Sequence, residues 1–351
     1  MANKTRLVTG GVDTHGATHH GAVVDELGRV LGDQEFPVGA GGYRRLLCWM
    51  RSFGRLQRVG VEGTGTYGAG LARHLSGAGV ELVEVDRPDR KTRRTKGKSD
   101  PIDAIAAARA ALSGSAAGIP KTRSGPVEAI RALRVARRGA VKARTAALNQ
   151  LHGVIVSAPE PVRAVLAALS TLAVVERCAG FRIDETRLLE PEQGTRAALR
   201  ALARRIQQLN DEIRIADARL SGAVRTVAPR TVALFGAGTH SVGQLLVTAG
   251  DNPERLRSEA AFAHLCGSAP LPASSGRVDR HRLNRGGDRA ANNALYTIAL
   301  TRMRYDPATR DYVDRRTKQG LSKKEILRCL KRYVAREAHA TLLADLAALG
   351  T

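Results

Sequence analysis

Cysteine and aromatic side chains are scarce in this sequence of 351 residues. It contains 4 Cys, and Phe, Trp and Tyr together make up 3% of the chain. The cysteines lie far apart and show no Cys-x-x-Cys spacing, which argues against both a disulfide framework and a zinc site of closely spaced cysteines. So few aromatic rings also argue against a protein that binds single-stranded nucleic acid mainly by stacking bases.

Long apolar runs are absent as well. No stretch approaches the roughly 18 consecutive apolar residues of a membrane-spanning helix, and the N-terminal residues MANKTRLVTGGVD lack the apolar run of a signal peptide. We therefore expect a cytoplasmic protein without a membrane partner. Hydrophobic residues still make up 43% of the chain, which is enough for the buried cores of two or three domains.

Acidic residues are outnumbered by basic ones. The chain has 56 Lys and Arg against 33 Asp and Glu, which gives a formal net charge of +23. Nucleic acid is the commonest partner of such a charge, and an anionic membrane surface is the weaker alternative. The basic residues gather in four segments, which are residues 87–98, 131–144, 277–289 and 315–336. We expect these segments to contact phosphates with a salt-sensitive affinity.

The side chains expected to bind nucleic acid come from all four segments. In residues 131–144, four of them recur near one helical face, where unpaired like charges are mildly destabilising unless they meet an anion. With few aromatic rings, recognition of RNA by shape and backbone is favoured over side-chain reading of bases. The expected set is Arg90, Lys91, Arg93, Arg94, Lys96, Lys98, Arg131, Arg134, Arg138, Lys142, Arg277, Arg280, Arg282, Arg285, Lys323, Lys324, Arg328, Lys331 and Arg332.

The fold class expected is α/β followed by mainly α. Three apolar or β-branched runs within residues 6–36 predict a meander of antiparallel strands. The pattern then predicts a helix, a strand, a helix and a strand up to Val85, which is the element order of a ribonuclease-H-like fold. Two long Ala, Leu and Arg patterns further on predict a coiled-coil-like hairpin. We expect domains at 1–115, 116–227 and 228–351, the last of them mainly helical.

Four carboxylates stand at the ends of these predicted elements. Asp13 ends the first strand, Glu62 ends the fourth, and Asp100 and Asp103 begin a helix on which they share one face. If the first and fourth strands are neighbours, these acids meet in one cleft, where their repulsion calls for cations. A pair of Mg²⁺ ions held by hard oxygen ligands would satisfy them. Taken alone, Asp13 can serve a turn and Asp100 can complement a helix dipole. Glu62 is harder to dismiss, because it follows an apolar strand, where a buried acid needs a partner.

The three segments GVDTH, VEGTGTYG and KSDPIDA resemble the Asp, Glu, Asp, Asp motif of the DEDD transposases of the "one-ten" insertion-sequence family. The N-terminal domain of that family resembles the Holliday-junction resolvase RuvC. The resemblance implies that Asp13, Glu62, Asp100 and Asp103 are catalytic metal ligands.

A second segment, PLPASSGRVDRHRLNRGGD, resembles the C-terminal signature of the same transposases. On chemistry alone, a Ser-Ser-Gly stretch is usually a turn, and a serine hydroxyl is a weak nucleophile until it is activated. The resemblance implies that Ser275 is the recombinase nucleophile, with Ser274 in reserve. Gly287-Asp288 matches the Gly-Asp/Asn pair of the family, and residues 315–336 match its basic tail.

The family implies a recombinase that forms a phosphoserine intermediate and is guided by a structured noncoding RNA, the bridge RNA. It also implies donor and target DNA as partners, and a homo-oligomer that is a dimer, with a tetramer on the nucleoid DNA. Two alternatives stay open from the residues themselves. One is a metal-dependent DNA junction nuclease in which the serine segment only binds, and the other is a non-catalytic nucleic-acid-binding protein.

Overall fold

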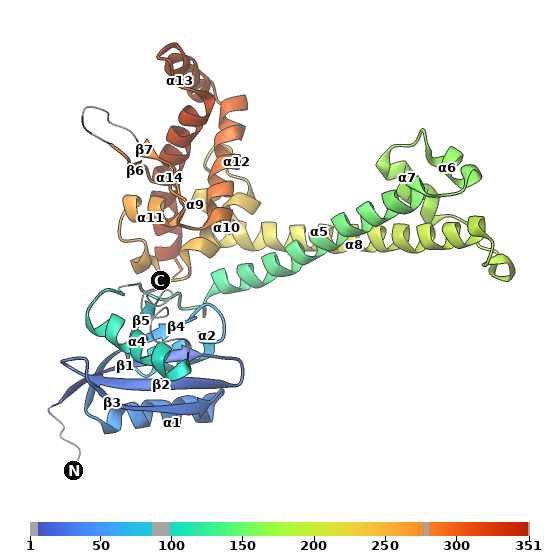
Figure 1. Ribbon diagram of the computed structural model, residues 1–351. Helices are drawn as coiled ribbons and strands as arrows, with labels where there is room; N and C mark the ends of the chain where they lie inside the picture. Colours follow the sequence, from blue (N-terminus) through green and yellow to red (C-terminus); the bar gives the residue numbers. More distant parts are fainter. Residues whose placement is uncertain (1–5, 86–98, 117, 275, 277–280, 350–351) are drawn as a thin grey trace. The chain divides into compact units, whose positions relative to one another are not determined.

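The computed structural model describes residues 6–85, 99–116, 118–274, 276 and 281–349 (Figure 1). The chain divides into two compact units. The first unit consists of Met1–Glu128 and Leu245–Thr351, and the second unit consists of Ala129–Gln244. The three domains expected from the sequence stay a prediction. No helix among the described residues has both the length and the apolar character that crossing a bilayer requires.

A five-stranded sheet begins the first unit, with strand order β3-β2-β1-β4-β5. The first three strands form the expected antiparallel meander, and β1, β4 and β5 run parallel to one another. The expected neighbours, the first and fourth strands, do pair. The strands are β1 (Leu7–Thr14), β2 (Thr18–Asp25), β3 (Val30–Pro37), β4 (Arg55–Glu62) and β5 (Glu81–Val85).

Helices cover both faces of this sheet (Figure 1). Apolar side chains at alternate positions of β1 and β4, including Val12 and Val61, pack with Leu46, Met50 and Leu71 from the helices of one face. The other face carries a single helix rich in alanine, which contacts β1, β2 and β4. The helices of the first face are α1 (Ala40–Ser52) and α2 (Ala69–Gly77), and that of the second face is α4 (Asp100–Leu112).

Two glycines allow α4 to lie directly on the sheet. Gly11 of β1 and Gly60 of β4 are register partners. A Cβ atom on Gly11 would lie 2.2 Å from the carbonyl oxygen of Ala104, and one on Gly60 would lie 2.5 Å from that of Ala107. Because both obstacles are helix backbone, only glycine fits at either position. The strand residues two positions further on therefore face the beginning of α4.

The C-terminal part of the first unit is mainly helical, as expected. Ala299 packs with Ile326 and Leu330 in one of its apolar clusters. The segment that follows α4 is bonded to this region, because Lys121 Nζ donates to the carbonyl oxygen of Val247 (2.5 Å). The elements are η2 (Pro253–Arg255), α11 (Glu259–Leu265), β6 (Leu271–Pro272), β7 (His281–Arg282), α12 (Arg289–Tyr305), α13 (Pro307–Lys318) and α14 (Lys323–Ala347).

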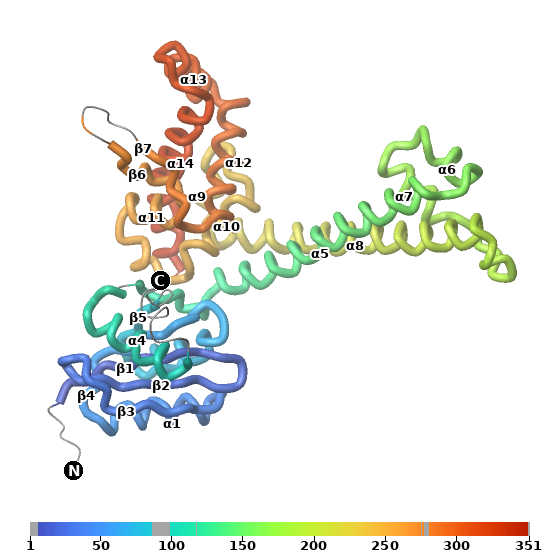
Figure 2. Tube along the Cα trace, in the orientation of Figure 1, coloured from blue at the N-terminus to red at the C-terminus, as the bar shows by residue number. Residues whose placement is uncertain are grey.

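The second unit contains the expected helical hairpin, in which two long helices lie side by side (Figure 2). Ala147 and Leu151 of the first helix share a core with Leu199, Ala203 and Ile206 of the second. The elements are α5 (Pro126–Val156), α6 (Glu160–Leu166), α7 (Thr171–Ala179), η1 (Glu185–Arg187), α8 (Pro191–Val227), α9 (Pro229–Val232) and α10 (Thr239–Ala249), of which α5 and α10 cross the unit boundary.

Polar residues interrupt the coiled-coil-like stripe of α8. Its buried residues follow a heptad spacing in which Ala203 and Val224 occupy one repeated position. The two intermediate positions of that series are Asn210 and Asp217. Asn210 accepts a hydrogen bond from Arg144 of α5 (3.2 Å), and Asp217 pairs with Arg137 of α5. Such polar pairs at stripe positions fix the register of two helices.

Candidate metal centre and serine segment

Asp13 and Glu62 reach the same end and the same face of the sheet. Asp13 follows Gly11 by two residues in β1, and Glu62 follows Gly60 by two residues in β4. Because side chains alternate along a strand, both carboxylates share the α4 face with the two glycines. Thr14 fixes this strand end by donating a hydrogen bond from Oγ1 to the carbonyl oxygen of Glu62 (2.8 Å).

The other two acids belong to the first turn of α4, where negative charge also complements the helix dipole. Ser99 occupies the N-cap position with an extended backbone, and Pro101 lies in the first turn, where proline is tolerated. Asp103 is 2% exposed, whereas the Asp100 side chain is 45% exposed. Asp103 therefore lies against the sheet while Asp100 remains open to solvent.

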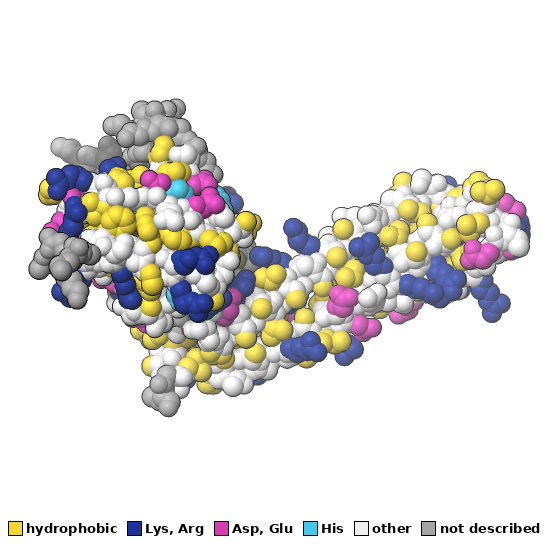
Figure 3. Space-filling model, turned by 90° about the horizontal axis from the view of Figure 1, so that it is seen from below, with side chains coloured by type: hydrophobic (Ala, Val, Ile, Leu, Met, Phe, Trp, Pro, Cys, Tyr) yellow, Lys and Arg dark blue, Asp and Glu magenta, His cyan; other side chains and the backbone are white. Residues whose placement is uncertain are grey.

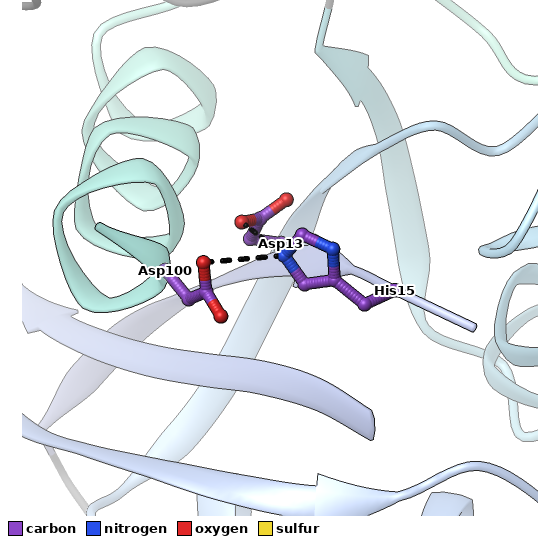
Figure 4. Close-up of side chains that lie close together, drawn as sticks. All are labelled: Asp13, His15 and Asp100. Atoms are coloured by element: carbon purple, nitrogen blue, oxygen red, sulfur yellow. Dashed lines mark hydrogen bonds and ion pairs between the residues drawn. The ribbon is translucent and has the colours of Figure 1, made fainter. Parts of the chain in front are cut away.

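His15 joins this cluster, and the sequence analysis did not identify it. Its Nε2 atom lies 3.1 Å from Oδ2 of Asp13 and 3.3 Å from Oδ1 of Asp100. Figure 4 shows the three side chains pointing toward one another, Asp13 from the end of β1, His15 from just after it and Asp100 from the start of α4. The signal that could have found His15 is its spacing, since it follows Asp13 by two residues and continues the same face.

The three side chains offer ligand atoms that all lie within 4.8 Å of one another, and among the described residues this group alone meets that test. Carboxylate oxygens and an imidazole nitrogen are suitable ligands for a divalent metal ion. The structure thus brings Asp13 and Asp100 together as expected. Glu62 and Asp103 are outside this tight group, and each has other interactions.

The serine segment is only partly described. Ser275, Arg277 and Arg280 lie outside the described residues. Ser274 is exposed, and Gly276 has a φ of +58°, a left-handed value that favours glycine. The two strands that flank the segment, β6 and β7, pair antiparallel as the arms of a hairpin, through Leu271 with Arg282 and Pro272 with His281.

The hairpin is anchored by the Gly287-Asp288 pair. A Cβ atom on Gly287, whose φ is +92°, would lie 2.7 Å from three backbone atoms, including the carbonyl oxygen of His264. Asp288 caps α12 by accepting hydrogen bonds from the amides of Ala290 and Ala291. It also accepts a hydrogen bond from Thr248 Oγ1 (2.7 Å). Gly287 and Asp288, the pair that matches the transposase signature, therefore have a structural role between β7 and α12.

Lys331 differs from the other basic residues expected to bind nucleic acid. It is 7% exposed, and its Nζ donates to Oδ1 of Asn292 at 2.9 Å. The amide nitrogen of Asn292 in turn donates to the carbonyl oxygens of Cys266 and Gly267, both at 2.9 Å. Burial also lowers the pKa of Lys331. These contacts argue against the expected phosphate contact. They connect Lys331 through Asn292 to the backbone of Cys266 and Gly267, which precede β6.

Other expected nucleic-acid ligands vary in exposure. Arg134 donates hydrogen bonds to His240 and Gln244 within the second unit, Arg332 pairs with Glu259, and Arg131 is half-buried. Figure 3 shows Lys and Arg side chains spread along the second unit on the face in view. Those outside the described residues are Arg90, Lys91, Arg93, Arg94, Lys96 and Lys98. The exposed ones are Arg138, Lys142, Arg282, Arg285, Lys323, Lys324 and Arg328.

Comparison with known families accounts for both signatures. A family model described as "Transposase", for DEDD proteins of IS110 elements, matches residues 10–158. A second model, described as "Transposase IS116/IS110/IS902 family", matches residues 232–314. The chain belongs to the IS110 transposase family. The first match spans the four carboxylates, and the second spans the serine segment with Gly287 and Asp288.

Two curated relatives of this IS110-family chain are proteins of insertion elements. One, from Streptomyces coelicolor, is named "Insertion element IS110 uncharacterized 43.6 kDa protein" and is 29% identical over 43% of this chain. The other, from Mycobacterium paratuberculosis, is named "Insertion element IS900 uncharacterized 42 kDa protein" and is 30% identical over 34% of this chain. The alignments cover 38% and 31% of the two relatives, so the chain matches about a third of their length.

Proposed function

We propose that this protein is the transposase of an insertion element and recombines DNA at a metal-dependent site. The observation that carries the proposal is the meeting of Asp13 on β1 with Asp100 on α4, beside Glu62 and Asp103. These acids come from three elements and converge at one end of the sheet, which a set of unrelated surface charges would not require. The strand order supports a RuvC-like assignment of this domain.

Asp13, Glu62, Asp100 and Asp103 would hold Mg²⁺, and the residues present fit that role because carboxylate oxygens are its preferred protein ligands. A pair of ions at such a site stabilises negative charge on the scissile phosphate and on both exchanging oxygens. The carboxylates of the chain position this charge, and the basic segments bind the DNA backbones on either side. We place the reaction in the cytoplasm, on nucleoid DNA.

Ser275 is the proposed nucleophile. Its Oγ forms a bond to the phosphorus atom while the bond from phosphorus to a deoxyribose oxygen breaks. The hydroxyl proton of the serine leaves, and the departing deoxyribose oxygen is protonated as a hydroxyl. The resulting phosphoserine keeps a phosphate ester for the return step, in which a deoxyribose hydroxyl of the exchanged strand displaces the serine.

The exposed basic residues support binding of nucleic acid backbones by shape. We propose donor and target DNA as substrates and a structured noncoding RNA as the guide that supplies sequence choice. A homo-oligomer, a dimer that becomes a tetramer on DNA, would bring two DNA sites together. The cheapest check on the guide is whether DNA flanking this gene folds into an RNA with loops complementary to the element ends and the insertion site.

The test of the proposed function is a covalent adduct between protein and DNA. The element, with its flanking noncoding DNA, is supplied together with the protein and Mg²⁺, and adducts are resolved on a denaturing gel. We expect an adduct with the wild-type chain and with Ser274→Ala, and none with Ser275→Ala. An undiminished adduct in Ser275→Ala would overturn the assignment of the nucleophile.

The same assay separates the alternatives. DNA cleavage without any adduct in the wild-type protein would favour a junction nuclease in which water attacks. Recombination that persists in both Asp13→Asn and Glu62→Gln would favour a role for this chain as a nucleic-acid-binding protein without catalysis.

A further inference from the structure

The imidazole of His15 lies between the carboxylates of Asp13 and Asp100. Its Nε2 atom is within 3.3 Å of an oxygen of both Asp13 and Asp100. One ring nitrogen carries at most one hydrogen, so it can donate a well-aligned hydrogen bond to only one of these carboxylates at a time. Hydrogen bonding by itself therefore does not account for the position of His15 between two acids.

The two distances from His15 to the carboxylates match the spacing of adjacent ligands around one ion, and all three ligand atoms lie within 4.8 Å of one another. An octahedral ion with bonds of about 2.1 Å places adjacent ligand atoms about 3.0 Å apart. The distances from Nε2 to the two carboxylate oxygens, 3.1 and 3.3 Å, are close to this value. The three side chains could then bind one ion with only small movements.

The cluster is also reachable from solvent. The side chains of His15 and Asp100 are 40% and 45% exposed, whereas that of Asp13 is 9% exposed. The backbone of His15 is fixed where the chain turns into β2, because its amide donates to the carbonyl oxygen of Thr18 (3.0 Å). An ion held here would have one buried ligand, two outer ligands and open positions for water or phosphate.

We propose that His15 is a metal ligand together with Asp13 and Asp100, and that this mixed nitrogen and oxygen site binds Mn²⁺ more tightly than Mg²⁺. The inference rests on the proposed function, because it specifies which ion the same site holds. Mg²⁺ prefers oxygen ligands and keeps much of its water. Imidazole favours first-row transition-metal ions, so replacing one oxygen ligand by His15 shifts the preference away from Mg²⁺.

The chain offers a matched control in His20. This residue is the register partner of Asp13 on β2, but its Nε2 bonds to Oδ2 of Asp33 at 2.7 Å. His15→Ala and His20→Ala therefore each remove one imidazole from the same strand pair, and only the first removes a proposed ligand. Because the His15 side chain is 40% exposed, we expect His15→Ala to fold normally. Circular dichroism checks that it does.

The experiment measures metal binding by the full-length chain without an affinity tag and without DNA. Titrations give the affinities for Mn²⁺ and Mg²⁺, and pulsed electron paramagnetic resonance of bound Mn²⁺ detects coupling to a ligand nitrogen. We expect nitrogen coupling in the wild-type protein and in His20→Ala, and its loss in His15→Ala. The affinity for Mn²⁺ should fall about tenfold or more in His15→Ala, because loss of a residue that only supports a ligand already costs this much. The affinity for Mg²⁺ should fall less, so the ratio of the two affinities decreases.

The outcomes separate this inference from the proposed function. Mn²⁺ binding without nitrogen coupling, or an unchanged affinity ratio in His15→Ala, would overturn the role of His15 and leave the carboxylate site intact. Binding of neither ion by the wild-type chain would contradict the metal dependence of the proposed function itself. Both the role of His15 and the proposed function predict that Asp13→Asn loses metal binding. This variant therefore tests whether the titration reports binding at this site.

Discussion

Gly11 and Gly60 stand opposite each other on neighbouring parallel strands, and the backbone of α4 closes over both. This pair decides where the helix that carries Asp100 and Asp103 lies. Two residues further along the same strands, Asp13 and Glu62 face the start of that helix. The two glycines therefore allow α4 to pack closely on the sheet, and this packing brings together carboxylates that are distant in sequence.

Replacing either glycine with alanine should displace α4. The new Cβ in Gly11→Ala would lie 2.2 Å from the carbonyl oxygen of Ala104, which is backbone that cannot rotate away. We expect a loss of at least about 2 kcal/mol in the free energy of unfolding, together with weaker metal binding because Asp100 moves from Asp13. Denaturant unfolding and metal titration measure the two effects.

Gly139→Ala is the matched control for this change. Gly139 lies within α5, and a Cβ atom there would meet nothing within 4 Å. Alanine is favoured over glycine inside a helix, so we expect this variant to gain about 0.5–1 kcal/mol of stability. If Gly11→Ala and Gly139→Ala had equal effects on stability and on metal binding, the position of α4 would not depend on glycine at residue 11.

The sheet and the approach of Asp13 to α4 could be predicted because they follow from local patterns. Apolar or β-branched runs marked the first strands, and Asp100 and Asp103 marked the start of α4. His15 could not be placed in the same way, because its meeting with Asp100 depends on how closely α4 docks. That docking is set by Gly11 and Gly60, whose close approach to the helix leaves no periodic signal in the sequence.

Lys331 shows a different limit. The density of basic residues in 315–336 predicted phosphate contacts along the segment, but the phase of α14 decides which of these residues face inward. Ile326, Leu330 and Val334 mark the buried stripe of that helix, and Lys331 falls beside it. Helical phase could have identified Lys331 as buried, whereas its partner Asn292, distant in sequence, could be found only from the fold.

Lys331 and Lys324 should therefore respond differently to substitution. Lys331→Ala removes a buried donor and leaves the Oδ1 atom of Asn292 without it, which should cost about 1–3 kcal/mol of unfolding free energy. Lys324→Ala should leave stability nearly unchanged and lower the salt slope of nucleic-acid binding by about 0.9, the value for one phosphate on double-stranded DNA. Denaturant unfolding and binding titrations over a range of salt distinguish them. If Lys331→Ala were stably folded and lowered the salt slope of nucleic-acid binding, Lys331 would contact a phosphate, as first predicted.

The Arg137–Asp217 pair should stabilise the packing of α5 on α8. Nε and Nη2 of Arg137 donate to Oδ1 and Oδ2 of Asp217, and the two side chains are 28% and 36% exposed. A double-mutant cycle with alanine should give a coupling energy of about 1 kcal/mol, at the upper end for ion pairs that are not fully buried.

Arg187 and Glu190 supply the comparison, because they also form a two-bonded pair at 2.7 Å but are 57% and 49% exposed. Their cycle should give a smaller coupling energy than the cycle of Arg137 and Asp217, because solvent screens exposed ion pairs. If the two cycles gave the same coupling energy, the position of Asp217 in the α8 stripe would have no energetic consequence.

Asp25 should make the first unit sensitive to acid. Burial raises the pKa of its carboxyl group, but hydrogen bonds from Arg29 and Leu27 and the charge of Arg29 outweigh burial and lower the pKa to about 2. Because the pKa is lower in the folded than in the unfolded chain, the stabilising contribution of Asp25 is complete above about pH 4 and is lost as the pH falls toward 2. Asp25→Asn has no such titration. The stability difference between the wild-type protein and Asp25→Asn, measured by urea unfolding from pH 5 to pH 2, should therefore shrink steadily, and a constant difference would mean that these hydrogen bonds do not hold the carboxylate in its charged form.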